Sequence, residues 1–501
     1  MRPTLFKITL LPAIFGLALL TFSASAQEVS TTDLLRQLKL MQEQMNDMRS
    51  NYDAQIKKLQ EEIKTLKSKP TTAAAATEAT VIKSESSRLA GSTTADAEQD
   101  LYQTLKKRAT EWLPPSPIPG LDLDAAVVVD AFYHYDNDKE GVDHLKGSMG
   151  GFGGHAHDHG EEGHSHSHSH SHIKDGFNMR HVELSLSAAV DPYFEAWANM
   201  AFDDDGAELE EAVIQTSNLP WGLTLSVGKI KSGIGRVNRQ HSHSWDFLDA
   251  PLIHESLFGA HGLTEKGLQL TWLAPTPFYL LFGAEAFNGD NEKLFNEVDS
   301  DDFPHHNGPR LWTSFVKFGP DLGDRHAMQL GLSYTQGRHQ LLETHGDHAH
   351  RFDGDNRIYG VDAVYKYNAG RSHGHGDLVV QAEYFFRDSD MELLNNGRDF
   401  STRQDGYYLQ ALYGILPRWR LGLRWDQVGL KNTVEDPHEG EIKYGASNRA
   451  TAMLDWKLSE FSLLRFQLAN CNFATAAGRQ HAWEMAMQLQ ILIGKHAAHD
   501  F

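Results

Sequence analysis

Hydrophobic and polar residues alternate with a period of two along most of the chain after residue 120. In the stretch LDLDAAVVVDAFYHY, Val127 and Tyr133 fall on one face of an extended strand, whereas Asp130 and His134 fall on the other. The same alternation recurs in about sixteen segments of about ten residues, the length with which a tilted strand crosses a membrane. The pattern predicts an all-β fold over residues 120–501, a transmembrane antiparallel up-and-down β-barrel of about 16 strands.

The connections between these segments indicate the same fold. Tight turns such as APTP and LPR alternate with long polar connections, and short turns on one rim with long loops on the other are typical of outer-membrane barrels. Aromatic residues near predicted strand ends fit the rings found at membrane interfaces; they are Trp272, Phe278, Trp419 and Trp456. We therefore expect the protein to lie in the outer membrane of a Gram-negative bacterium, in contact with its lipid.

The first 119 residues follow different patterns. Residues 1–26 combine early positive charges, an apolar run and small residues before Gln27, which predicts a signal peptide. Residues 27–69 carry apolar heptads that predict an α-helical coiled coil in the periplasm, and residues 70–119 read as a linker with a short amphipathic helix. We expect a homo-oligomer, with a trimer as the first candidate, although methionine-rich heptads do not fix the number of chains.

Composition narrows the function classes. The formal net charge is −21, which disfavours nucleic acid as a partner. Cys471 is the only cysteine, so the chain has no intrachain disulfide. The sequence contains no Gly-x-Ser-x-Gly motif and no clear Ser/His/Asp set, so we expect no enzyme and no catalytic residues.

If one face of each strand meets lipid, the other face lines the lumen. The residues predicted to line the pore are Asp122, Asp124, Asp130, Glu183, Glu285, Asp362, Glu383, Arg420, Arg424 and Asp455. The excess of acids predicts a modest cation preference, which screening limits away from a constriction. Plain solvation of the wall is the alternative interpretation.

Residues 229–266 form a long connection that is too apolar to project into water, and loops of this length are usually functional. We expect it to fold inward as a constriction loop. Its candidate residues are His241, His243, Trp245, Asp246, Asp249, His254 and Glu255. The histidines either pack the loop against the wall through hydrogen bonds or form a metal-selective constriction.

A histidine-rich stretch, GGHAHDHGEEGHSHSHSHSHI, spans residues 153–173 and is predicted to join the first two strands on the outward-facing rim. Candidate metal ligands in this and a later predicted outward loop are His155, His157, His159, His164, His166, His168, His170, His172, His345, His348 and His350. Imidazole suits zinc, copper and nickel, and a flexible array with no fixed tetrahedral site binds several ions weakly. The stretch is internal, so it is not a terminal tag, but a neutral histidine expansion remains an alternative.

The run LTLSVGKIKSGIGRVNRQHSHSWDFLDAPL resembles the corresponding stretch of phosphate-selective-type porins. The chain is more similar to a group of zinc-regulated, TonB-dependent-labelled outer-membrane receptors, which share an H-x-H-x-W-x-F-x-D type segment and a tail like LIGKHAAHDF. This resemblance covers most of residues 120–501. It implies a role for His241, His243, Trp245 and Asp249, and for two C-terminal histidines, His496 and His499.

Two departures qualify the resemblance. The predicted lumen is acidic, whereas a phosphate-selective pore needs a ladder of basic residues. Energy-coupled receptors usually have 22 strands and a folded plug, which the first 119 residues do not predict.

The patterns together predict an outer-membrane porin for small hydrophilic solutes that favours divalent metal cations, zinc first. The alternatives are an energy-coupled (TonB-dependent) zinc receptor and a non-transporting, metal-binding tether. No cofactor is obligatory in any of these interpretations, because Zn²⁺ or another transition metal would be a transported or loosely bound ion.

Overall fold

The computed structural model describes residues 122–494 apart from 153–172, 205, 292, 299, 301, 346–347, 438–439 and 476. The predicted signal peptide, coiled coil and linker, the histidines from 155 to 172, and His496 and His499 lie outside the described residues. Among the described residues, no helix is long and apolar enough to cross a membrane.

The elements are β1 (Asp122–Asp136), α4 (Val142–Gly147), β2 (Gly176–Ala189), β3 (Phe194–Asp203), β4 (Gly206–Thr216), η1 (Pro220–Gly222), β5 (Leu223–Lys231), η2 (Val237–Arg239), η3 (Ser242–Ser244), α5 (Leu252–Phe258), β6 (Thr264–Leu273), β7 (Tyr279–Phe287), β8 (Leu311–Gly319), β9 (His326–His345), β10 (His348–Tyr367), η4 (Ser372–Gly374), β11 (Leu378–Leu393), β12 (Arg398–Leu416), β13 (Trp419–Asp436), β14 (Gly440–Lys443), β15 (Ser447–Ser459), β16 (Ser462–Thr475) and β17 (Gly478–Gly494).

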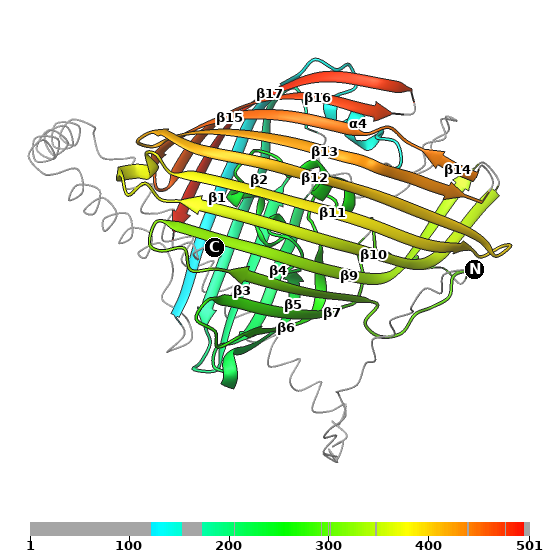
Figure 1. Ribbon diagram of the computed structural model, residues 1–501, viewed down its shortest axis with the longest axis horizontal. Helices are drawn as coiled ribbons and strands as arrows, with labels where there is room; N and C mark the ends of the chain where they lie inside the picture. Colours follow the sequence, from blue (N-terminus) through cyan, green and yellow to red (C-terminus); the bar gives the residue numbers. More distant parts are fainter. Residues whose placement is uncertain are drawn as a thin grey trace, which may run out of the picture. The chain divides into compact units, whose positions relative to one another are not determined.

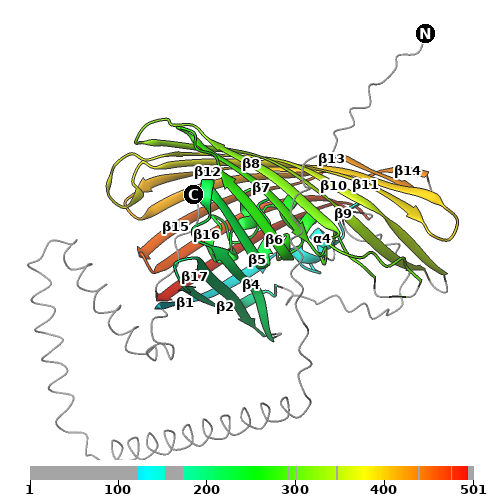
Figure 2. The ribbon, with the colours of Figure 1, turned by 90° about the horizontal axis from the view of Figure 1, so that it is seen from below.

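The strands form one antiparallel sheet that closes on itself. β1 pairs with β2 on one side and with β17 on the other, so Val128 lies opposite both Glu183 and Leu492. β13, β14 and β15 lie in the upper half of Figure 1, and Figure 2 shows β17, β1 and β2 together where the sheet closes. β14 and β15 both pair with β13 and share one position, so the 17 described strands make a barrel of sixteen. This confirms the predicted closed antiparallel barrel.

The barrel is apolar outside and polar inside. On β13, Leu421, Leu423 and Trp425 are exposed, whereas Arg424 and Asp426 on the opposite face are buried. This polarity is the reverse of that in a water-soluble β protein, and it suits a wall that faces lipid. It arises from the period-two alternation of the sequence, because successive side chains of a strand point to opposite faces.

The connections on the two rims differ in length as predicted, but only in the first half of the barrel. One rim carries compact connections such as 190–193, 274–278 and 417–418, with Trp419 stacked on Trp456 at 5.3 Å between ring centroids. The other rim carries the long connections 137–175, 232–263 and 288–310. In the second half of the barrel, this rim has long strands such as β9 and β10 in place of long loops. His345 therefore ends β9 and His348 begins β10, so neither lies in an extended loop, which corrects the predicted loop.

Candidate functional site

The connection 232–263 folds into the barrel and is anchored there by an apolar core. Four side chains of α5, namely Leu252, Ile253, Leu257 and Phe258, are almost completely buried. Phe258 meets Phe385 of β11 edge to face, with 5.5 Å between ring centroids. Burial of each such side chain stabilises the inserted loop by about 1.5–3 kcal/mol. α5 ends at Phe258, and the next residue, Gly259, has a φ of 82°, a positive value that favours glycine.

The backbone of the loop bonds to the wall on several sides of the lumen. Glu285 of β7 accepts from the amide of Gly233 at 2.7 Å. Glu383 of β11 accepts from the amides of Arg236 and Val237 at 2.8 and 3.0 Å. Gln490 of β17 donates to the carbonyl of His243 at 2.7 Å. The loop therefore spans the lumen from wall to wall.

A buried ionic cluster fixes the middle of the loop. Asp249 pairs with Arg424 of β13 at 3.0 Å and with Arg449 of β15, and both arginines also pair with Asp426 at 2.9 and 3.2 Å. Burial raises the pKa of Asp249, but the two guanidinium groups outweigh this and hold that pKa well below its usual range. Asp249 therefore stays ionised and ties the loop to two wall strands.

A second ionic cluster lies beside it. Arg420 of β13 pairs with Asp246 of the loop and with Asp455 of β15, both at 2.6 Å, and Arg465 of β16 pairs with Asp455 at 2.7 Å. Arg465 also donates to the carbonyl of Trp245 at 3.2 Å. The wall acids at this level are thus neutralised by arginines.

His241 lies at the centre of a carboxylate cluster where the loop meets β2 and β4. Its Nδ1 is 2.9 Å from Oε2 of Glu210, and its Nε2 is 2.8 Å from Oε2 of Glu211. Oε1 of Glu183 lies 3.8 Å from the same Nδ1. Ligand atoms of Glu183, Glu210 and His241 lie within 4.8 Å of one another, a spacing that a metal ion could bridge.

Two further histidines surround Glu183. Nδ1 of His243 is 2.7 Å from Oε2 of Glu183, and Nε2 of His181 is 3.7 Å from the same oxygen. The rings of His241 and His243 are stacked, with centroids 5.8 Å apart. Glu183 and both of these rings are buried, so the cluster offers imidazole nitrogen and carboxylate oxygen out of bulk water.

Protonation of His241 explains how three carboxylates coexist in this cluster. Burial lowers the pKa of His241, but hydrogen bonds to Glu210 and Glu211 outweigh it and raise that pKa to about 9. With both ring nitrogens protonated, each donates to a carboxylate. A histidine nitrogen must lose its proton to bind a metal ion, so a bound cation would take the place of the proton and its positive charge.

A β-bulge places Glu210 and Glu211 together. The register of β3 with β4 passes from Asn199 opposite Glu211 to Met200 opposite Leu209, which leaves Glu210 as the extra residue. Two successive side chains therefore contact His241, which regular alternation forbids. Sequence reasoning missed both glutamates and Arg449, and the acidic run ELEE was the available signal for the glutamates.

The other predicted residues of the loop also contact the barrel interior. Nε2 of His254 lies 3.3 Å from Oε2 of Glu383, and Glu255 lies 3.5 Å from Lys146 of the first long connection. Burial lowers the pKa of Lys146, but Glu255 and Asp143 outweigh this and hold it well above its usual range. This pair joins the connection 137–175 to the connection 232–263.

Three more of the predicted pore-lining acids belong to the inner face of the wall. Asp130 accepts from Gln488 at 2.8 Å, and Asp362 pairs with Lys317 at 2.6 Å. Asp124 is half-buried in β1. The side chains of Asp122, His345 and His348 lie outside the described residues, and His350 stands in β10, away from the His241 cluster.

No family model matches the chain. An uncharacterized protein of Aquifex aeolicus (strain VF5) is 34% identical over 363 residues, which cover 70% of this chain and 73% of that protein. The resemblance to zinc-regulated receptors therefore stays a prediction.

Solved structures that are similar to this chain include three outer-membrane proteins. The outer membrane channel DcaP of Acinetobacter baumannii has 13% identity and a TM-score of 0.46, covering 74% of this chain and 96% of that one. OmpT of Vibrio cholerae has 9% identity and a TM-score of 0.45, with 76% and 100% covered. OprB of Pseudomonas putida has 12% identity and a TM-score of 0.44, with 74% and 94% covered.

Proposed function

We propose that this chain, which belongs to the same family as the uncharacterized protein of Aquifex aeolicus, forms an outer-membrane channel for divalent metal cations, with Zn²⁺ as the first candidate. The closed barrel with an apolar outer face and a polar inner face supports the membrane location. The trimer expected from residues 27–69 remains a prediction.

The observation that carries the cargo assignment is the cluster of His241, Glu183 and Glu210 inside the barrel. Imidazole and carboxylate together suit zinc and related cations. The cluster joins the wall to the loop, so a cation bound there would compete with the contacts that hold the loop. Cation binding and loop position are coupled in this proposal.

The channel is closed at the level of the loop in this proposal. The acids of the wall lie inside the barrel, but the loop covers them or arginines neutralise them, as for Glu383 and Asp455. A cation would meet these acids only after the loop moves. A loop that never moves would instead favour the tether, and the sixteen-strand barrel does not favour the energy-coupled receptor with its usual 22 strands.

The membrane location predicts a depth-dependent cost for charge on the outer face. Leu423→Arg, four residues from Trp419 on an outward-facing position of β13, is expected to destabilise the barrel by about 2–4 kcal/mol. Leu342→Arg, near the end of the long β9 strand, should cost about 0–1 kcal/mol. Urea unfolding in lipid vesicles, followed by tryptophan fluorescence, measures both. Equal costs of the two substitutions would contradict a bilayer that surrounds the barrel at Leu423 and ends before Leu342.

The cargo assignment is tested by ion flux. In vesicles that contain a zinc-sensitive dye, His241→Gln should lower the ratio of Zn²⁺ to K⁺ flux by about tenfold, the lower end of the loss that follows when a metal-site contact is removed. The matched control is His261→Gln, which changes a half-exposed histidine of the same loop. A parallel fall in both fluxes would mean that His241 only positions the loop, and an unchanged ratio would reject the cargo assignment.

A further inference from the structure

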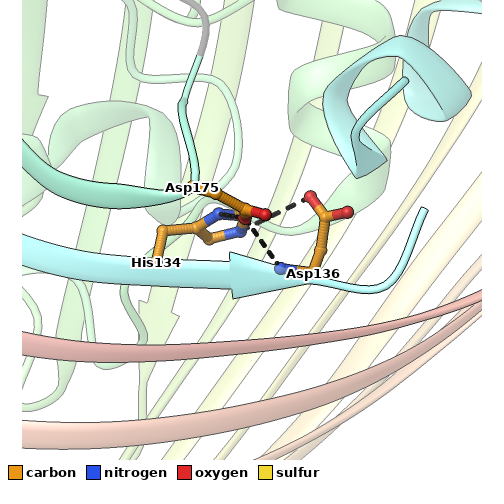
Figure 3. A group of neighbouring side chains, drawn as sticks. All are labelled: His134, Asp136 and Asp175. Carbon is orange, nitrogen blue, oxygen red and sulfur yellow. Dashed lines mark hydrogen bonds and ion pairs between the residues drawn. The ribbon is translucent and has the colours of Figure 1, made fainter. Parts of the chain in front are cut away.

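A second group of possible ligands lies at the rim of the barrel, where β1 ends and the histidine-rich connection begins. His134 and Asp136 end β1, and Asp175 stands just before β2, two residues after the described chain resumes at Ile173. Glu484 of β17 lies beside them, since Asp136 and Glu484 are opposite each other in the register. Figure 3 shows the side chains of His134, Asp136 and Asp175 gathered into one group.

The geometry of this group suits a single cation. Nδ1 of His134 is 3.6 Å from Oδ1 of Asp175, and its Nε2 is 3.6 Å from Oε1 of Glu484 and 4.0 Å from Oδ2 of Asp136. One ligand atom from each of His134, Asp136 and Asp175 lies within 4.8 Å of the others. Ligands that are each about 2.0–2.2 Å from a tetrahedral zinc ion lie about 3.3–3.6 Å apart, so these side chains would draw together when a cation binds.

Burial and hydrogen bonding set this group apart from an ordinary surface ion pair. His134 is 3% exposed and Glu484 5%. Nδ1 of His134 and Oε2 of Glu484 are buried atoms without a hydrogen-bond partner among the described residues. A buried polar atom without a partner is destabilising, and coordination of a cation would remove this cost.

The surrounding backbone orients the carboxylate of Asp136 in advance. Its Oδ1 accepts from the amide of Asp138 at 2.9 Å, and its Oδ2 accepts from the amide of Val142 at 3.1 Å. Such outer contacts fix the ligands of metal sites. Asp175 is 58% exposed, so the group is open to solvent on one side and buried on the other.

We propose that His134, Asp136 and Asp175, with Glu484 beside them, bind one divalent cation of the zinc type at the mouth of the barrel. One imidazole among carboxylates favours a borderline cation over Ca²⁺ or Mg²⁺, which prefer oxygen ligands alone. The site would hold a cation in a fixed position at the rim. This inference does not depend on transport through the lumen.

The test counts bound ions on the full-length protein in detergent. Because the histidines from 155 to 172 would bind metal themselves, they are first replaced by glutamine in every sample. Zn²⁺ is then titrated by calorimetry, and Co²⁺ by its visible absorption. We expect His134→Gln to remove one equivalent of bound ion, and Asp175→Asn to weaken that equivalent by about tenfold or more. His144→Gln changes an exposed histidine of the same connection and should leave the count unchanged.

The outcomes separate this site from the lumen cluster. His241→Gln should remove a different equivalent of bound ion. If His241→Gln loses an equivalent and His134→Gln does not, the lumen site is supported and the rim site is overturned. Equal Zn²⁺ binding by the parent, His134→Gln and His144→Gln would also overturn the proposal. Because the side chain of Asp175 is half-exposed, Asp175→Asn should still assemble. It can therefore test the site even if His134→Gln does not fold.

Discussion

Replacement of Asp249 by asparagine is expected to open the channel through the barrel, because the loop leaves the lumen. Asp249 is the loop residue that pairs with both Arg424 and Arg449, two buried wall arginines. Removal of one partner of a buried ion pair costs about 3–5 kcal/mol, because it leaves uncompensated charge inside. The substitution destabilises the inserted state of the loop in particular, because the arginines still pair with Asp426 when the loop leaves the lumen. Since about 1.4 kcal/mol corresponds to a tenfold change in an equilibrium, we expect the mean conductance in planar bilayers to rise by about tenfold or more.

The control changes an ion pair of similar length at the surface. Glu441→Gln removes the exposed 2.7 Å pair with Lys443 on β14 and should leave the conductance unchanged. A band of unchanged heat-modifiable mobility on gels verifies that both variants are folded. Conductance of Asp249→Asn equal to that of the parent would show that the apolar contacts of α5, and not the ionic cluster, hold the loop.

Gly228→Ala is expected to prevent assembly of most of the protein. A Cβ at this position would stand 1.9 Å from the carbonyl oxygen of Ala212 on the neighbouring strand, and the φ of 141° disfavours any side chain. β4 and β5 pair over only four residues, from Ala212 to Gln215, so the clash falls on a short seam of the barrel. We expect the heat-modifiable folded fraction after refolding into detergent to fall well below half.

Gly206→Ala separates the clash from the backbone strain. Gly206 has a φ of 144°, but a Cβ there would meet nothing within 4 Å. Strain at an unfavourable φ costs about 1–3 kcal/mol, so this variant should assemble with reduced stability. Equal assembly of the two variants would mean that β4 and β5 can separate without loss of the barrel.

Sequence reasoning reached the barrel because lipid imposes a strict rule on the wall. Each strand must present apolar side chains to one face, and residues such as Leu421, Leu423 and Trp425 show this directly in the sequence. The approximate strand number followed from counting such segments. The inward position of Asp130, Glu183 and Glu383 followed from the same period.

The partners of the inward residues could not be predicted in the same way. Glu210 and Glu211 share a face only because of a bulge, and alternation assigns successive residues to opposite faces. Pairs such as Asp249 with Arg449 join residues 200 positions apart, and their pairing depends on where the loop crosses the barrel. The local pattern contains no information on that crossing. The long hairpin of β9 and β10 was missed because its polar outer part resembles a loop.

The loop that fills the lumen also constrains the order in which the protein folds. Its bonds to the last strands join residues far apart in the chain, with 220 positions between Trp245 and Arg465 and 247 between His243 and Gln490. Those partners hold their places only once β16 and β17 have paired with their neighbours. Contacts of such long range form late, because the intervening chain must first be ordered. The loop therefore cannot be fully seated in the lumen before the last two strands are in place, so its docking belongs to the late steps of assembly.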